Sequence, residues 1–180
     1  MGAPLAPMLL GLPRPIRRSV AIVLASNLLR RLTHVLADPR VSWVAFAIAF
    51  WAWHLPALYD RSLRSDSWHH VQHACFFATA MLFWRPVIRP WPGRWSWPRW
   101  TMIPYLLLAD VQNTVLAAIL TFSDRLIYPA YAAVSGGGAS VLDDQATAGV
   151  IMWLPGSLVF LVAAMYLAMA ALEHARSSTV

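Results

Sequence analysis

Four long apolar stretches constrain the fold of this chain more than any other feature of its sequence. They cover residues 41–59, 67–88, 100–122 and 146–172. Each is close to the roughly 20 residues that a helix needs to cross the hydrocarbon core of a bilayer. Backbone groups inside a membrane must be paired within their own segment, and these runs lack the alternation of barrel strands. The sequence therefore predicts an all-α protein, a polytopic transmembrane helical bundle with four spanning helices.

The composition agrees with a membrane protein. Hydrophobic residues make up 59% of the 180 positions and charged residues only 12%, about half the charged fraction of an ordinary soluble domain. The net charge is +6, and every basic residue is an arginine. Because the arginines flank the apolar stretches instead of forming one patch, we interpret them as topology signals and expect no nucleic-acid partner.

The distribution of arginines predicts the orientation. Six precede the first stretch, and four lie between residues 85 and 99, whereas the other two connections hold few arginines and several aspartates. Arginine-rich connections stay in the cytoplasm, so both termini are predicted to be cytoplasmic. The chain is accordingly divided into a basic N-terminal segment (1–40), a membrane domain (41–172) and a cytoplasmic tail (173–180).

Residues 16–37 form a separate case. Their apolar centre is too short to cross a bilayer, and pairs of arginines bracket it. This pattern is typical of an amphipathic helix that lies in the membrane interface. A re-entrant segment or a fifth crossing is the alternative.

The predicted topology brings polar side chains from three stretches to the external end of the bundle. They are His54 near the end of the first stretch, His69 and His73 at the start of the second, and Asp144 at the start of the fourth. Histidines four positions apart share one face of a helix, and imidazole suits copper, zinc, iron and nickel. We therefore predict that these four side chains form one metal site.

Other polar residues are given supporting roles. His70 points about 100° away from His69 on a helix. Asp143 either caps the fourth helix or binds beside Asp144. Asp110, midway along the third stretch, belongs either to a polar clasp between helices or to a proton or metal relay.

Four motifs, taken together and in order, resemble the signatures of one family. They are W-H-L-P at 53–56, H-x-x-x-H at 69–73, F-S-D-x-x-x-Y-P at 122–129 and D-Q-x-x-x-G-x-x-M-W at 144–153. From about residue 41 to residue 172 the chain resembles the CtaG family of assembly factors for caa3-type cytochrome c oxidase.

The resemblance implies a bacterial cytoplasmic-membrane protein, not an enzyme, that helps to mature a haem–copper oxidase. Copper is the metal it implies, ahead of zinc or haem. The expected partners are the lipid bilayer and oxidase subunits, and also a second copy or another membrane protein, since family members are usually longer. The family's polar signature falls on His54, His69, His73, Asp124, Tyr128, Asp144 and Gln145, and Gln112 matches a glutamine usual in the third of these helices.

Three other functions remain open from the residues alone. His54 and His73, on adjacent helices, form a candidate axial pair for a haem. A zinc or iron ion beside Asp144 would activate water in a membrane enzyme, although the sequence contains no H-E-x-x-H motif. The third is a scaffold whose histidines bond only to backbone and whose lipid-facing surface contacts the oxidase.

Overall fold

The structure, a computed structural model, describes residues 35–36, 38–89, 97–129 and 139–177, and all the regular secondary structure in these ranges is helical. The prediction of an all-α protein is therefore confirmed for these ranges, while the interfacial helix predicted at 16–37 lies almost wholly outside them. The elements are α4 (Pro39–Trp53), α5 (Pro56–Arg64), α6 (Asp66–Ile88), the 3-10 turn η1 (Arg99–Thr101), α7 (Met102–Phe122) and α9 (Ala139–Ser177).

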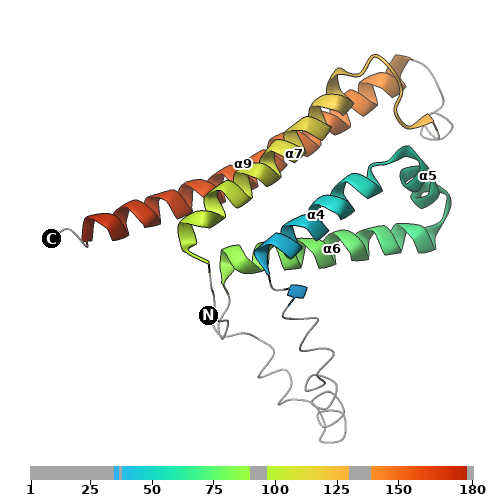
Figure 1. Cartoon of the computed structure of the whole chain (residues 1–180). Coiled ribbons are helices and arrows are strands. Elements are labelled where there is room, and N and C mark those ends of the chain that lie inside the picture. The colour runs from blue at the N-terminus through green and yellow to red at the C-terminus, as the bar shows by residue number, and fades with distance from the viewer. Residues whose placement is uncertain (1–34, 37, 90–96, 130–138, 178–180) are drawn as a thin grey trace, which may run out of the picture.

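The helices form two groups. Figure 1 shows α7 and α9 running side by side as an antiparallel pair, and α4 packed along α6 with α5 across the end of that second pair. The two groups meet where α6 ends and α7 begins. They diverge toward the end that carries α5, the start of α6 and the start of α9.

The first predicted stretch, 41–59, is two helices and not one. Leu55 has extended backbone angles, φ −67° and ψ 133°, because the ring of a following proline excludes helical geometry from the residue before it. Pro56 then opens α5, where its missing N–H costs nothing. The axes of α4 and α5 differ by 71°. His54 therefore lies at a sharp break in the chain.

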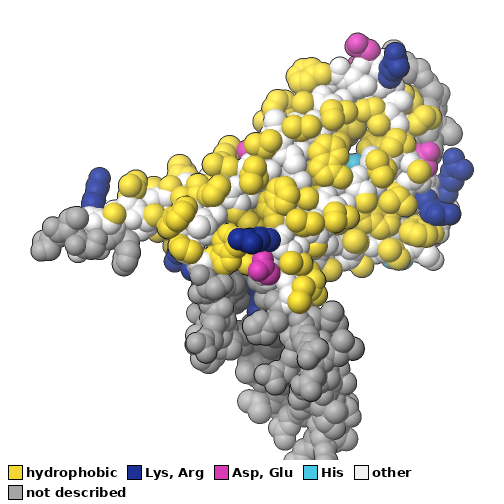
Figure 2. Space-filling model, in the orientation of Figure 1, with side chains coloured by type: hydrophobic (Ala, Val, Ile, Leu, Met, Phe, Trp, Pro, Cys, Tyr) yellow, Lys and Arg dark blue, Asp and Glu magenta, His cyan; other side chains and the backbone are white. Residues whose placement is uncertain are grey.

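Length and composition qualify two helices in the described ranges for crossing a membrane, Arg99–Phe122 and Val141–Ser177, or three if the bent α4–α5 pair counts as one span. The predicted number of four spans is not confirmed. Helix α6 has 23 residues, but its first turns carry Asp66 and three histidines, which lower its hydropathy. The face shown in Figure 2 is mainly hydrophobic, and its charged side chains lie mostly toward the ends.

Small residues allow α7 and α9 to pack closely. Gly149 lies against the backbone of Ala117, and Gly156 lies against the side chain of Asn113. Small side chains at such positions let membrane helices approach each other. Asp110, predicted to join a polar clasp, has a buried Oδ1 with no hydrogen-bond partner in the described ranges.

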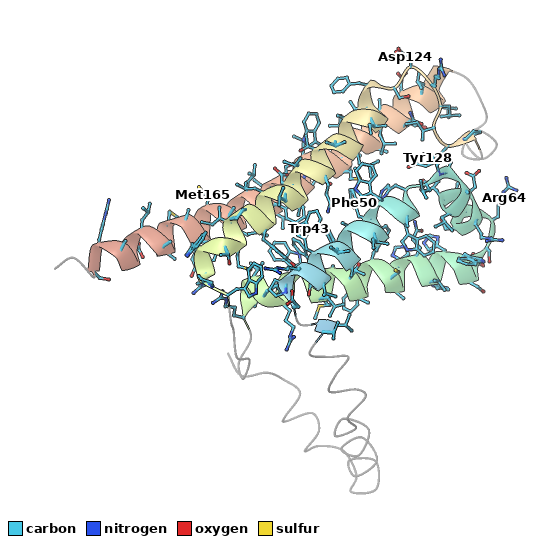
Figure 3. All side chains as sticks on the ribbon, viewed as in Figure 1. Trp43, Phe50, Arg64, Asp124, Tyr128 and Met165 are labelled. Atoms are coloured by element: carbon cyan, nitrogen blue, oxygen red, sulfur yellow. The ribbon has the colours of Figure 1, made fainter. Side chains whose placement is uncertain are left out.

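Aromatic side chains join the two groups at their common end. The ring of the fully buried Phe83 lies 4.6 Å from that of Tyr105 and 4.5 Å from that of Phe46. The Tyr105 hydroxyl donates to the Phe83 carbonyl at 3.0 Å, and Trp43 Nε1 donates to the Tyr105 carbonyl at 3.2 Å. Trp43 accordingly lies between the groups in Figure 3. These contacts anchor one end of the bundle and leave the diverging end to form a pocket.

Candidate functional site

The four side chains predicted to bind a metal lie at the diverging end of the bundle. His54 follows the last turn of α4, His69 and His73 lie in the first turns of α6, and Asp144 lies near the start of α9. Figure 1 shows these helix ends on the same side of the molecule. The rings of Trp53 and Trp68, 6.2 Å apart, connect the end of α4 directly to the start of α6.

His69 and His73 form a close pair. Their Nε2 atoms are 2.8 Å apart, and their rings are nearly parallel, with centroids 4.6 Å apart. At this distance one Nε2 donates a hydrogen bond and the other accepts it, as two neutral imidazoles can do. Both side chains are exposed. The i, i+4 spacing thus places two ring nitrogens at one point on an accessible helix face.

His54 is held by the backbone of its own helix. Its Nδ1 lies 2.6 Å from the Phe50 carbonyl oxygen. A carbonyl only accepts, so Nδ1 carries the hydrogen and the neutral ring keeps its lone pair on Nε2. No described residue is bonded to Nε2. Metal-binding histidines are commonly oriented in this way, by a ring N–H that donates to a backbone carbonyl.

A pocket of about 260 Å³ lies beside His54, between the two helix groups. Its other polar walls come from Tyr59 on α5, Tyr128 in the connection after α7, and Asp144 and Gln145 on α9. Figure 2 shows a histidine side chain at the bottom of a hollow in the hydrophobic face. The pocket therefore combines a histidine, a carboxylate and two phenols with largely apolar surroundings.

The four predicted ligands are thus divided between two places. His69 and His73 are paired on α6, whereas His54 and Asp144 line the pocket. Within the described ranges no three His, Cys, Asp or Glu side chains are placed to hold one ion together. A complete four-ligand site is not formed in this part of the chain.

Gln145 joins α9 to the connection that follows α7. It is buried, with 7% of its surface exposed. Its Oε1 accepts from the Ile127 backbone N–H at 2.7 Å. Its Nε2 donates to the Arg125 carbonyl at 3.2 Å and more weakly to the Leu120 carbonyl at 3.5 Å. Gln145 therefore holds the backbone of the F-S-D-x-x-x-Y-P motif in place.

Tyr128 extends this support to His54. Its hydroxyl donates to the His54 carbonyl at 2.9 Å, and its ring lies 4.1 Å from the ring of Tyr59. Burial, with a smaller contribution from Tyr59, raises the pKa of Tyr128 to about 12. The phenol therefore stays protonated and able to donate at any physiological pH. In Figure 3 Tyr128 lies on the side of the connection that faces α5.

The remaining predicted residues do not line this pocket. Asp124 is exposed at the tip of the connection and points away from the bundle (Figure 3). His70 and Asp143 are also exposed, and the His70 ring is 6.4 Å from the His69 ring. Gln112 is buried along α7, and neither its Nε2 nor its Oε1 has a hydrogen-bond partner in the described ranges.

Five residues that line the pocket are not among the predicted site residues, and two of these, Tyr59 and Met152, bring a phenol and a thioether to it. Met152 stands inside the D-Q-x-x-x-G-x-x-M-W motif. It lies seven positions after Gln145, a spacing that returns to the same helix face. This spacing from Gln145 is the sequence signal that indicates Met152 as a pocket residue. Tyr59 reaches the pocket only because the chain bends at Pro56, so no local pattern indicated it.

The network of Gln145 gives a first prediction. Gln145→Leu is expected to lower the free energy of unfolding by about 2–3 kcal/mol, because it leaves the Ile127 N–H and the Arg125 carbonyl without their partner. Thermal unfolding in detergent, followed by circular dichroism, measures the effect. The neighbouring and exposed Asp144→Asn variant is the control and should unfold like the wild type. Equal unfolding temperatures for both variants would show that the network does not support the fold.

A comparison with known families completes the description of the site. The profile of the family described as cytochrome c oxidase caa3 assembly factor (Caa3_CtaG) matches residues 1–174. The match includes all four motifs and also the N-terminal segment, which contains none of them. No curated protein and no solved structure matches the chain significantly. Because the family profile covers nearly all of the sequence, the resemblance is confirmed, and the chain belongs to the caa3-type CtaG family of cytochrome c oxidase assembly factors.

Proposed function

We propose that this protein is a membrane-embedded assembly factor that binds copper and helps to mature a haem–copper cytochrome c oxidase. The family supplies the assembly role, and the long apolar helices support a place in the membrane. The observation that carries the copper-binding part is the pair of imidazoles on α6, whose Nε2 atoms meet at 2.8 Å on an exposed face.

The chemistry of the His69–His73 pair suits a copper ion that is bound reversibly and then transferred to another protein. Imidazole nitrogens bind first-row metals at about 2 Å, so the two rings need only a small outward rotation to replace their shared hydrogen by an ion. Two protein ligands leave the other coordination positions open, which keeps a copper ion exchangeable. A buried site with four fixed ligands would retain it instead.

His54 and Asp144 are proposed as additional ligands at the same end of the bundle, which join the α6 pair only when α6 closes toward the pocket. His54 keeps a lone pair on Nε2 because Nδ1 donates to Phe50. Asp144 lines the same pocket and provides a carboxylate that binds an ion or orients a ring N–H. The start of α6 contacts the end of α4 through Trp53 and Trp68, and we propose that a closing movement at this end of the bundle brings the pair toward the pocket.

The distribution of arginines supports an external position for this end of the bundle in the cytoplasmic membrane. Oxidase subunits are then the proposed partners, with transfer along the outer leaflet. The protein acts as a carrier and not as an enzyme. A haem held by His54 and His73 is less well supported, since His73 is not among the described residues that line the His54 pocket. The pocket is also below the range of about 300–1,000 Å³ that is usual for larger ligands.

Metal analysis of the purified protein tests this proposal. After loading with Cu(I) and gel filtration, the protein is expected to hold about one copper ion per chain, as a site of borderline-soft imidazole ligands should. An absorption spectrum of the protein as isolated should show no Soret band. Copper that is lost entirely on gel filtration would contradict the copper assignment, and a Soret band would favour haem.

A further inference from the structure

Two arginines, Arg40 and Arg89, contact Trp97 at the end of the bundle opposite the histidines, and Arg99 lies near Arg89. The Arg40 guanidinium carbon lies 4.9 Å from the centroid of the Trp97 ring, and Arg89 Nη2 donates to the Trp97 carbonyl at 2.7 Å. Burial, and then the charge of nearby Arg99, lower the pKa of Arg89. Residues from α4, from the end of α6 and from η1 thus concentrate positive charge in one small region.

The charge of this region is not balanced by ion pairs of Arg40 or Arg99 with described residues. The carboxylate of Asp38, two positions before Arg40, is used to cap α4, with Oδ1 accepting from the Arg40 backbone N–H at 2.8 Å. The Arg40 guanidinium instead stacks on Trp97. Both guanidinium groups therefore keep donors for an anionic ligand.

Two apolar grooves adjoin these arginines. One, of about 310 Å³, has Arg40 and Trp97 in its wall and is otherwise lined mainly by hydrophobic side chains of α4 and α7, such as Val44 and Leu108. The other, of about 470 Å³, lies between η1 and α9 and has Arg99 in its wall. Each groove is thus hydrophobic along most of its wall and has a guanidinium group at its side.

We infer that this end of the bundle binds one anionic phospholipid, with its phosphate beside Arg40, an acyl chain in the groove between α4 and α7, and the charges of Arg89 and Arg99 adding to the positive potential. Guanidinium groups match the oxygens of a phosphate with paired hydrogen bonds. Basic pockets between membrane helices are recognised sites for anionic headgroups, and tryptophan favours the headgroup level. A free phosphate would use the arginines but would not occupy the adjoining hydrophobic groove, so the combination of charge and groove favours a lipid. This inference is independent of copper binding.

Lipid binding by the full chain in detergent tests the inference. Native mass spectrometry should detect preferential binding of phosphatidylglycerol over phosphatidylcholine. Since each arginine contributes about 1 kcal/mol toward an anionic headgroup, Arg40→Gln plus Arg99→Gln should weaken phosphatidylglycerol binding by roughly 30-fold. The matched control is Arg61→Gln plus Arg64→Gln, which removes two arginines from the opposite end and should leave the preference unchanged.

A second variant tests the contribution of the hydrophobic groove separately from that of the arginines. Leu108→Trp is expected to fill the groove and weaken phosphatidylglycerol binding while all three arginines remain, and circular dichroism verifies that each variant is folded. Equal binding of the two lipids by the wild type would overturn the inference, as would an unchanged preference in the Arg40/Arg99 variant. If inorganic phosphate alone competes fully with the lipid, the region is only an anion site and the lipid assignment is wrong.

Discussion

Gly149→Ala is expected to destabilise the α7–α9 pair more than Gly156→Ala does. A Cβ at this position would overlap Thr121 Oγ1 and would lie 3.0 Å from the Ala117 carbonyl oxygen and 3.0 Å from the Thr121 nitrogen. The last two atoms belong to the backbone of α7 and cannot rotate away, so the helices must move apart. We expect a loss of about 2–3 kcal/mol of unfolding free energy, at the upper end for overpacking.

Gly156→Ala is the matched control for this effect. Its Cβ would approach only the side chain of Asn113, with Nδ2 at 2.7 Å, and that side chain can adopt another rotamer. The expected loss is about 1 kcal/mol or less. Unfolding by a denaturing detergent, followed by tryptophan fluorescence, compares the two variants. If Gly156→Ala were as damaging as Gly149→Ala, the close approach of the backbones would not explain the glycine at 149.

Replacing both histidines of the α6 pair is expected to have the largest effect on function. His69→Ala plus His73→Ala removes both nitrogens that meet at 2.8 Å. Loss of a supporting residue around a metal already costs about 10–100-fold in affinity, so loss of both ligands should weaken Cu(I) binding by more than about 100-fold. Competition with a chromophoric chelator measures the affinity. In cells that depend on this protein, oxidase activity should fall to the level of a deletion strain.

His70→Ala provides the control on the same helix turn. Its ring is 6.4 Å from that of His69 and is not part of the close pair. Copper affinity and oxidase maturation should therefore stay at wild-type levels. Unchanged copper binding in the double variant would place the copper elsewhere. Normal oxidase maturation in a variant that has lost His54, His69 and His73 would show that the protein acts as a scaffold without copper.

The extents of α6 and α7 could be predicted from the sequence, whereas α9 (Ala139–Ser177) extends beyond the predicted stretch 146–172 at both ends. The apolar stretch at 67–88 corresponds to α6, Asp66–Ile88, because the length of an apolar run is a local property. The break at Leu55 was also readable in principle, since Pro56 restricts the residue before it. It was missed because hydropathy alone does not distinguish a straight helix from a bent one.

The support of the pocket could not be predicted in the same way. Gln145 bonds to the backbone 18 positions earlier, and Tyr128 bonds to a carbonyl 74 positions earlier. Such bonds depend on how helix groups pack, which no local pattern specifies. The division of the four histidine and aspartate ligands between the α6 pair and the pocket has the same origin, since the topology specifies an end of the bundle but not the direction of each ring.

Helix α9 is longer than a bilayer is thick. Its 39 residues correspond to a rod of about 58 Å. A bilayer measures roughly 40–45 Å even with its headgroups, and tilts beyond about 40° are unusual. At ordinary tilts, a turn or more of this helix must stand in water. Part of α9 is therefore a helical surface outside the hydrocarbon and headgroup layers.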